Sequence, residues 1–183
     1  MYETNKFRSG SSNYRRYYHM PMWALDPGAS GATAVYPDSN TVGGWQVNAS
    51  TEYLYSQSDV HNDWDGQSNL VIEIAFEKNT IGGSASDTVN IDVVCTYKGV
   101  GEAITKTQTI QKAITVDDSA RYTQFKDEIE IDYDKVDNNV QTGDSMHFRI
   151  NINTADSDCD DIIINSLSFY YNTTHSGIED GDI

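Results

Sequence analysis

Apolar and polar residues alternate along most of this chain. In the stretch 71–77, Ile72, Ile74 and Phe76 fall on one side of an extended backbone, and the residues between them fall on the other. The stretch 146–152 repeats the pattern. Because successive side chains of a β-strand point to opposite faces, this period of two predicts strands with one buried and one solvated face. Such strands are typical of antiparallel sheets.

Segments with this pattern are separated by turn-prone clusters of Gly, Asn and Asp, and no stretch shows a helical period of any length. The predicted strands are residues 33–36, 44–48, 52–56, 69–77, 88–97, 107–116, 122–133, 145–153 and 162–171. Short strands at this spacing predict an all-β protein, an antiparallel β-sandwich of the jelly-roll type.

The chain divides into three predicted parts. Residues 1–32 are expected to form an extended N-terminal arm and linker, because they are rich in small polar residues and in prolines that discourage helix. Residues 33–173 carry the strand pattern and form the jelly roll. Residues 174–183 are acidic and are expected to be a disordered tail.

The formal net charge of −16 and the pI near 4.3 argue against nucleic acid as a partner, since phosphate backbones attract Lys and Arg. Residues 1–25 nevertheless carry a net charge of +3, which leaves −19 for the rest of the chain. No apolar run is long enough for a membrane span or for the core of a signal peptide. We therefore expect synthesis in a cytoplasm and no membrane partner.

The first 25 residues combine positive charge with many aromatic side chains. We expect this arm to bind a partner protein, because basic side chains complement an acidic surface and aromatic side chains dominate interface energetics. Its predicted contact residues are Lys6, Arg8, Tyr14, Arg15, Arg16, Tyr17, Tyr18 and Trp23. The arm would become ordered on docking. Deletion of residues 1–25 is then expected to leave a folded body that no longer attaches.

The two cysteines predict no disulfide framework. Cys95 lies in an apolar strand segment and is expected to be a buried free thiol, while the acidic residues around Cys159 would blunt its reactivity. Mutual repulsion in that acidic loop would make a cation such as Ca²⁺ helpful. The candidate ligands are Asp156, Asp158, Asp160 and Asp161. A solvated acidic loop is the simpler interpretation, so we expect no cofactor.

A second acidic segment, residues 61–66, begins like an EF-hand loop, with oxygen donors at alternate positions before Gly66. Its first ligand position would be a histidine and its twelfth would be Ile72 instead of Glu. We therefore interpret the segment as a tight turn in which Asp63 and Asp65 bond the backbone and Gly66 adopts a positive φ.

Sequence signals for catalysis are weak. The histidines have no metal-binding spacing such as His-Glu-x-x-His, and there is no Gly-x-Ser-x-Gly elbow. Glu73 and Glu77 share a strand and could be a glycosidase pair, but two acids on the wet face of an amphipathic strand are typical of simple solvation. We expect a protein that is not an enzyme, with a subunit of an enzyme as a remote alternative.

Aromatic residues of the first half of the chain are candidates for a sugar-binding platform, because aromatic faces stack on the apolar faces of flat ligands. The residues concerned are Trp45, Tyr53, Tyr55 and Trp64. Packing in the core or in a subunit contact is the alternative, since Tyr and Trp are also enriched in protein interfaces.

Four short pieces carry a resemblance to a known group of proteins. They are residues 63–66 leading into 70–76, residues 92–97, residues 143–144 leading into 148–150, and residues 160–162 leading into 167–171. Together they resemble short jelly-roll proteins encoded among the virion structural genes of tailed bacteriophages. One departure is Val60-His61-Asn62, where those proteins usually have a Pro before the loop. The resemblance implies a non-enzymatic particle protein, often a trimer.

These observations together predict a bacteriophage virion structural protein on the surface of the particle, made in the host cytoplasm and tethered to other virion proteins by its arm. Capsid decoration is favoured over a head or tail fibre, because the chain is short and lacks the repeats of a long shaft. The main alternative is a carbohydrate-binding, lectin-like module, since one fold serves many functions. The two overlap if a virion protein binds a host glycan.

Overall fold

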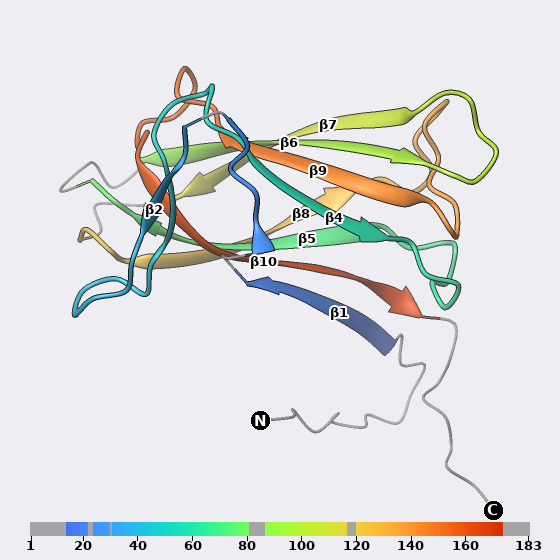
Figure 1. The fold of residues 1–183 in the computed structure, drawn as a ribbon, viewed down its shortest axis with the longest axis horizontal. Coiled ribbons are helices and arrows are strands. Elements are labelled where there is room, and N and C mark those ends of the chain that lie inside the picture. The colour runs from blue at the N-terminus through green and yellow to red at the C-terminus, as the bar shows by residue number, and fades with distance from the viewer. Residues whose placement is uncertain (1–13, 22–23, 30, 81–86, 117–119, 174–183) are drawn as a thin grey trace, which may run out of the picture.

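The computed structural model describes residues 14–21, 24–29, 31–80, 87–116 and 120–173, which form two β-sheets packed face to face (Figure 1). Within those residues, ten strands follow one another along the chain. They are β1 (Tyr14–Pro21), β2 (Thr33–Val35), β3 (Gly44–Val47), β4 (Leu54–Asp59), β5 (Leu70–Lys78), β6 (Thr88–Lys98), β7 (Lys106–Thr115), β8 (Gln124–Ile131), β9 (Ser145–Ile152) and β10 (Ile162–Thr173). Each strand predicted from the sequence is present, with its ends shifted by a few residues.

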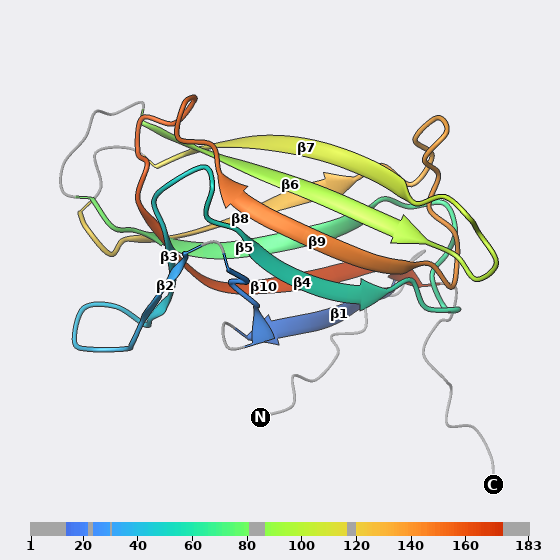
Figure 2. The same ribbon diagram turned by 45° about the horizontal axis from the view of Figure 1, so that its top comes forward.

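Sheet topology confirms the predicted fold class. The larger sheet has the order β2-β3-β10-β5-β8, with β1 also paired to β10, and the smaller sheet has the order β4-β9-β6-β7 (Figure 2). All of these pairs are antiparallel. Consecutive strands alternate between the sheets from β4 to β6 and again from β7 to β10. Two antiparallel sheets with such crossovers form a β-sandwich of the jelly-roll type.

The core lies between the sheets and is built from the faces that the alternation predicts. Ile74 and Phe76 of β5 are fully buried, and Phe148 and Ile150 of β9 are each only 1% exposed. Phe148 meets Phe169 of β10 across the interface, with ring centroids 5.5 Å apart. Alternate residues of each strand therefore fill one continuous core, and the residues between them form the two outer faces.

The structure departs from the sequence prediction at residues 14–21, which belong to the sandwich as strand β1. β1 pairs along its whole length with residues 166–173 of β10, next to the part of β10 that pairs with β3 (Figure 1). A register shift in the pairing of β10 with β5 falls between Ile164 and Ser166, where this change of neighbour occurs. Met20 is 8% exposed and joins the core. Residues 1–13 and Trp23 of the predicted arm lie outside the described residues, as does the predicted tail 174–183.

A polar cluster attaches β1 to the loop before β5. Arg16 forms an ion pair with Asp63 at 2.5 Å, and the hydroxyl of Tyr171 donates a hydrogen bond to the same carboxylate at 2.9 Å. Tyr18 bonds the Tyr171 hydroxyl at 3.1 Å and stacks on His61 with ring centroids 4.8 Å apart. Burial opposes the ionisation of Asp63, but the hydrogen bonds from Arg16 and Tyr171 outweigh it and hold the pKa of Asp63 below its ordinary value. The cluster therefore fixes β1 with a charged anchor.

The segment 61–66 is a turn and not an EF-hand loop. Asp65 accepts hydrogen bonds from the backbone N–H groups of Gln67 and Ser68, and Gly66 has a φ of +70°. The interpretation from sequence is confirmed for these two residues. Asp63 differs, because its carboxylate accepts bonds from the side chains described above. Asp63 differs because β1 places Arg16 next to this loop, and the sequence alone does not show that the two segments are neighbours.

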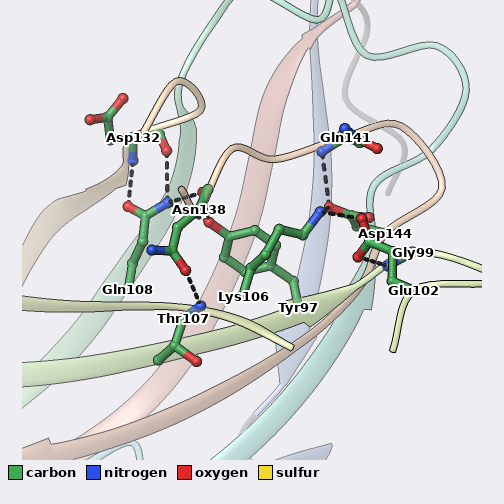
Figure 3. A network of polar contacts seen from close by, with 10 residues as sticks. All are labelled: Tyr97, Gly99, Glu102, Lys106, Thr107, Gln108, Asp132, Asn138, Gln141 and Asp144. Carbon is green, nitrogen blue, oxygen red and sulfur yellow. Dashed lines mark hydrogen bonds and ion pairs between the residues drawn. The ribbon is translucent and has the colours of Figure 1, made fainter. Parts of the chain in front are cut away.

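A buried ion pair joins the loop before β9 to the hairpin of β6 and β7 (Figure 3). The ammonium of Lys106 lies 2.9 Å from Oδ2 of Asp144, whose side chain is 1% exposed. The backbone N–H of Gln141 donates to the same oxygen at 2.9 Å. Beside this pair, the Tyr97 hydroxyl donates to the Asn138 carbonyl. These bonds hold a long irregular connection against the end of the sandwich.

Candidate functional site

A groove lies at β4, the edge strand of the smaller sheet, and extends to β9; its lining also includes the buried residues Met20 and Ser56. One hollow of about 440 Å³ is lined in part by Asp26, Tyr55, Gln57 and His147. A second hollow of about 380 Å³ continues it and shares Gln57 and His147 with the first. We call this continuous feature the β4–β9 groove. It combines one aromatic side chain with several exposed polar groups, which is the composition of a site for a small polar ligand.

Tyr55 is held rigidly at the head of the groove by the segment that follows β1. Its backbone N–H donates to the carbonyl of Asp26 at 2.8 Å, and its own carbonyl accepts from the Asp26 N–H at 3.0 Å. The tyrosine ring lies over Gly28, which has a φ of +58°, and a Cβ at that position would approach Cε2 of Tyr55 to 3.0 Å. Only glycine combines that backbone conformation with such close contact at no cost. The ring position is therefore set before any ligand binds.

A second tyrosine and an arginine lie beside Tyr55. The rings of Tyr53 and Tyr55 have centroids 6.3 Å apart. Arg149 is the cross-strand partner of Tyr55 on β9, and its guanidinium carbon lies 4.7 Å from the centre of the Tyr53 ring. Directly paired residues have Cβ atoms about 5 Å apart, so the three side chains form one cluster. We call Tyr53, Tyr55 and Arg149 the aromatic cluster.

The rows across the sheet show what surrounds this cluster. Outward-facing residues at matching register on β4, β9 and β6 are Tyr55, Arg149 and Val94 in one row, and Gln57, His147 and Thr96 in the next. Asp92 is the nearest acid on β6, and its carboxylate accepts a hydrogen bond from Gln111 at 3.1 Å. The outer face is therefore aromatic around Tyr53 and Tyr55 and polar around Gln57 and His147. Arg149 carries its positive charge in the row of Tyr55, beside the groove and outside the lining of its two hollows.

Of the four aromatic residues predicted as a sugar platform, the structure brings together only Tyr53 and Tyr55. Trp64 is 4% exposed, its indole N–H donates to the Ser68 carbonyl at 3.1 Å, and its ring meets Tyr133 edge-on. It belongs to the core and offers no face to a ligand. Trp45 is half-buried on β3 in the other sheet, where it packs against the core.

The predicted calcium ligands contact protein donors instead of one another. Asp158 accepts hydrogen bonds from the N–H and hydroxyl of Thr88, and Asp161 accepts bonds from Gln46 and Asn79. Asp156 accepts bonds from Asn153 and Gln111, and Asp160 is exposed. Across the described ranges, no group of three or more His, Cys, Asp or Glu residues is placed to hold a metal ion. Asp156, Asp158 and Asp161 thus each accept hydrogen bonds from neutral donors of the protein.

The two strand glutamates are engaged in structural bonds. Glu73 pairs with Lys126 at 2.8 Å across β5 and β8. Glu77 is only 2% exposed, which contradicts its predicted solvation, and it accepts bonds from the Thr41 hydroxyl and the Val42 N–H. The loop before β3 covers this end of β5, so Glu77 is buried although it lies at an outward-facing position of the strand. This arrangement provides no pair of carboxylates facing a shared hollow.

The cysteines and the described arm residues also have structural surroundings. Cys95 and Cys159 are both buried and free, and burial raises the pKa of the Cys95 thiol, as expected of an inert core residue. Arg15 lies over the ring of Tyr170, with 5.0 Å from its guanidinium carbon to the ring centre. Tyr17 packs against that same ring and remains 53% exposed.

A separate hollow, outside the β4–β9 groove, lies on the outer face of the larger sheet. It measures about 680 Å³ and is lined in part by Tyr17, Glu73, Lys126 and Ser168. Its charged residues are already paired with each other at 2.8 Å, and it has one exposed ring instead of two neighbouring ones. We regard it as the weaker candidate, because a ligand would have to compete with an existing ion pair. In the described part of the chain, no helix is long and apolar enough to span a membrane.

Comparison with known proteins identifies no family. No protein-family model matches the chain, and no curated protein matches it. Among solved structures, similar ones include the first family 36 carbohydrate-binding module of a xylanase from the hindgut metagenome of Trinervitermes trinervoides (TM-score 0.48, 11% identity, covering 89% of this chain and all of that one). Another is a family 36 module in complex with calcium and xylotriose (TM-score 0.45, 14% identity, 84% and 98% coverage).

A family 11 carbohydrate-binding module from Clostridium thermocellum in complex with a mixed-linked tetrasaccharide is also similar (TM-score 0.40, 11% identity, 91% and 94% coverage). Similarity at this level does not identify a ligand. The function must therefore be argued from the site itself.

Proposed function

We propose that this chain is a binding module that recognises carbohydrate in the β4–β9 groove. The observation that carries the proposal is the rigid placement of Tyr55 beside Tyr53, at the head of a groove lined by Gln57 and His147. Aromatic rings stack on the apolar faces of flat ligands, and a few convergent polar groups then fix the ligand's orientation. Sugar rings present one apolar face and a rim of hydroxyl groups, so they fit both parts of this surface.

The backbone supports this function because it pre-forms the site. Tyr55 is bonded through both its N–H and its carbonyl to Asp26, and its ring lies on Gly28. A ligand that binds a pre-formed platform does not have to order it, which lowers the entropic cost of binding. An open groove along two strands also suits an extended oligosaccharide better than an enclosed cavity would.

Replacement of Tyr55 by Ala is expected to weaken carbohydrate binding by at least about tenfold, because the central stacking surface is removed and 1.4 kcal/mol corresponds to a factor of ten. The measurement is a glycan microarray probed with the labelled full-length chain and with the variant, followed by calorimetric titration of the best ligand. Tyr36→Ala is the matched control, because Tyr36 is 71% exposed and lies after β2, away from the groove. The control should bind like the original chain.

Thermal melts of both variants establish that they fold. If no glycan binds the original chain, or if Tyr55→Ala binds as tightly as Tyr36→Ala, the proposed site is wrong. A loss of binding in both variants would point to an effect on stability and not to the groove.

The virion interpretation remains a prediction and is compatible with the groove. It rests on the short sequence pieces and on the arm, of which Lys6, Arg8 and Trp23 lie outside the described residues. Arg16 contributes to an ion pair within the sandwich, so it is less available to a partner than the sequence suggests. A glycan-binding module on a particle surface would combine both interpretations. Counting this chain in purified particles by mass spectrometry would test the virion interpretation and distinguish capsid decoration from a fibre.

A further inference from the structure

We infer that the β4–β9 groove selects sugars that carry a carboxylate, and that Arg149, beside Tyr55, is the residue that binds this carboxylate. This inference rests on the proposed function and adds the class of ligand. The guanidinium carbon of Arg149 lies 4.7 Å from the centre of the Tyr53 ring, and no acidic side chain in the described part of the chain forms an ion pair with it. Its planar donor fork is therefore available on an exposed strand position.

The position of Arg149 matches a ligand stacked on the tyrosines. Tyr55 is its direct partner across β4 and β9, so a sugar ring lying on Tyr55 would have its edge beside the guanidinium. An equatorial carboxylate on a ring carbon, as in a uronic acid, projects from that edge close to the plane of the ring. Arg binds carboxylates through two parallel N–H donors, which gives both strength and orientation. Stacking of the guanidinium on Tyr53 further reduces its freedom before binding.

The surrounding charge makes this arginine unusual in the molecule. The chain has a net charge of −16, and an acidic surface repels anionic ligands elsewhere. On the two rows across β4, β9 and β6, none of the neighbours of Arg149 is acidic; they are Tyr55, Val94, Gln57, His147 and Thr96. Three acids lie around these rows: Asp92, which is bonded to Gln111, Asp26, which is bonded to the N–H of Gly28, and Asp59, which is exposed and lines the second hollow. Arg149 is therefore an exposed cation beside Tyr55, two rows along β4 and β9 from Asp59.

The experiment is the same microarray, extended to pairs of glycans that differ only in the carboxylate. Suitable pairs are oligogalacturonate against its methyl ester, and sialyllactose against its methyl ester. We expect the acidic member of at least one pair to bind about 10- to 100-fold more tightly, as expected of a charge-assisted hydrogen bond, and we expect this preference to weaken as salt is raised. The two pairs distinguish uronic acids from sialic acids as the source of the carboxylate.

Arg149→Gln should abolish the difference in affinity between the acidic and the neutral member of the pair. Arg149→Lys should retain part of it, because lysine keeps the charge but not the fork. The inference fails if only neutral glycans bind, if esters bind as well as acids, or if Arg149→Gln keeps the preference. Those outcomes leave the proposed function intact, whereas the absence of any glycan binding by the original chain would overturn both.

Discussion

Deletion of residues 1–25 is expected to unfold the protein, and not to release a stable body from a docking arm. The deletion removes β1, the core side chains of Met20 and Leu25, and the partner of Asp63. Loss of one large buried side chain alone costs about 2–5 kcal/mol. Two of them, together with the hydrogen bonds of an eight-residue strand, approach the whole stability of an ordinary domain, which is about 5–15 kcal/mol.

Deletion also exposes residues 166–173 of β10 as an open strand edge, which favours aggregation. The measurement is denaturant unfolding and gel filtration of the truncated chain. Deletion of residues 1–13 is the matched control, because it keeps β1, and its unfolding midpoint should lie well above that of the 1–25 deletion. A stable, monodisperse chain lacking residues 1–25 would contradict the placement of β1 and restore the docking-arm hypothesis.

Replacement of Lys106 by Met is expected to lower the free energy of unfolding by about 3–5 kcal/mol, because it leaves the carboxylate of Asp144 buried without its counter-charge. Asp144 is fully buried, and its Oδ1 already has no hydrogen-bond partner in the described structure. The loop before β9 would lose one of its attachments to the hairpin of β6 and β7 (Figure 3). Urea unfolding monitored by tryptophan fluorescence measures the change.

Lys112→Met is the control for the loss of a lysine. Lys112 pairs with Asp127 at 3.3 Å, but its side chain is 39% exposed, so its removal should cost less than about 1 kcal/mol. Adding Asp144→Asn to Lys106→Met removes the uncompensated charge and should recover part of the stability. If Lys106→Met behaved like Lys112→Met, the ion pair would not be a structural attachment.

The sequence predicts the strands well because each one leaves a local signal. Strands such as β5 and β9 alternate so regularly that both the element and its buried face follow from the period of two. β1 has no such signal, because the doublets Arg15-Arg16 and Tyr17-Tyr18 hide the alternation. Tyrosine favours strands, which is the clue that could have identified it. Its charge pattern suggested an external partner, but the partner of Arg16 is Asp63, 47 residues away.

The candidate site is predictable only in part, because it depends on strand order. Tyr53 and Tyr55 were predicted as platform residues, and alternation places His147 and Arg149 together on the wet face of β9. Nothing in the sequence says that β4 lies beside β9 with Tyr55 opposite Arg149. For the same reason, the acidic loop suggested calcium, since the neutral donors that reach Asp158 and Asp161 come from distant strands and loops.

Chemical-shift mapping of the isotope-labelled full-length chain with the best-binding glycan tests the central claim most directly, because it locates the ligand on the surface. We predict that the largest shifts fall on the backbone amides of Tyr53, Tyr55 and Arg149 and continue along the groove to Gln57 and His147. Shifts centred instead on the outer face of the larger sheet, around Tyr17 and Lys126, would contradict the assignment of the binding site.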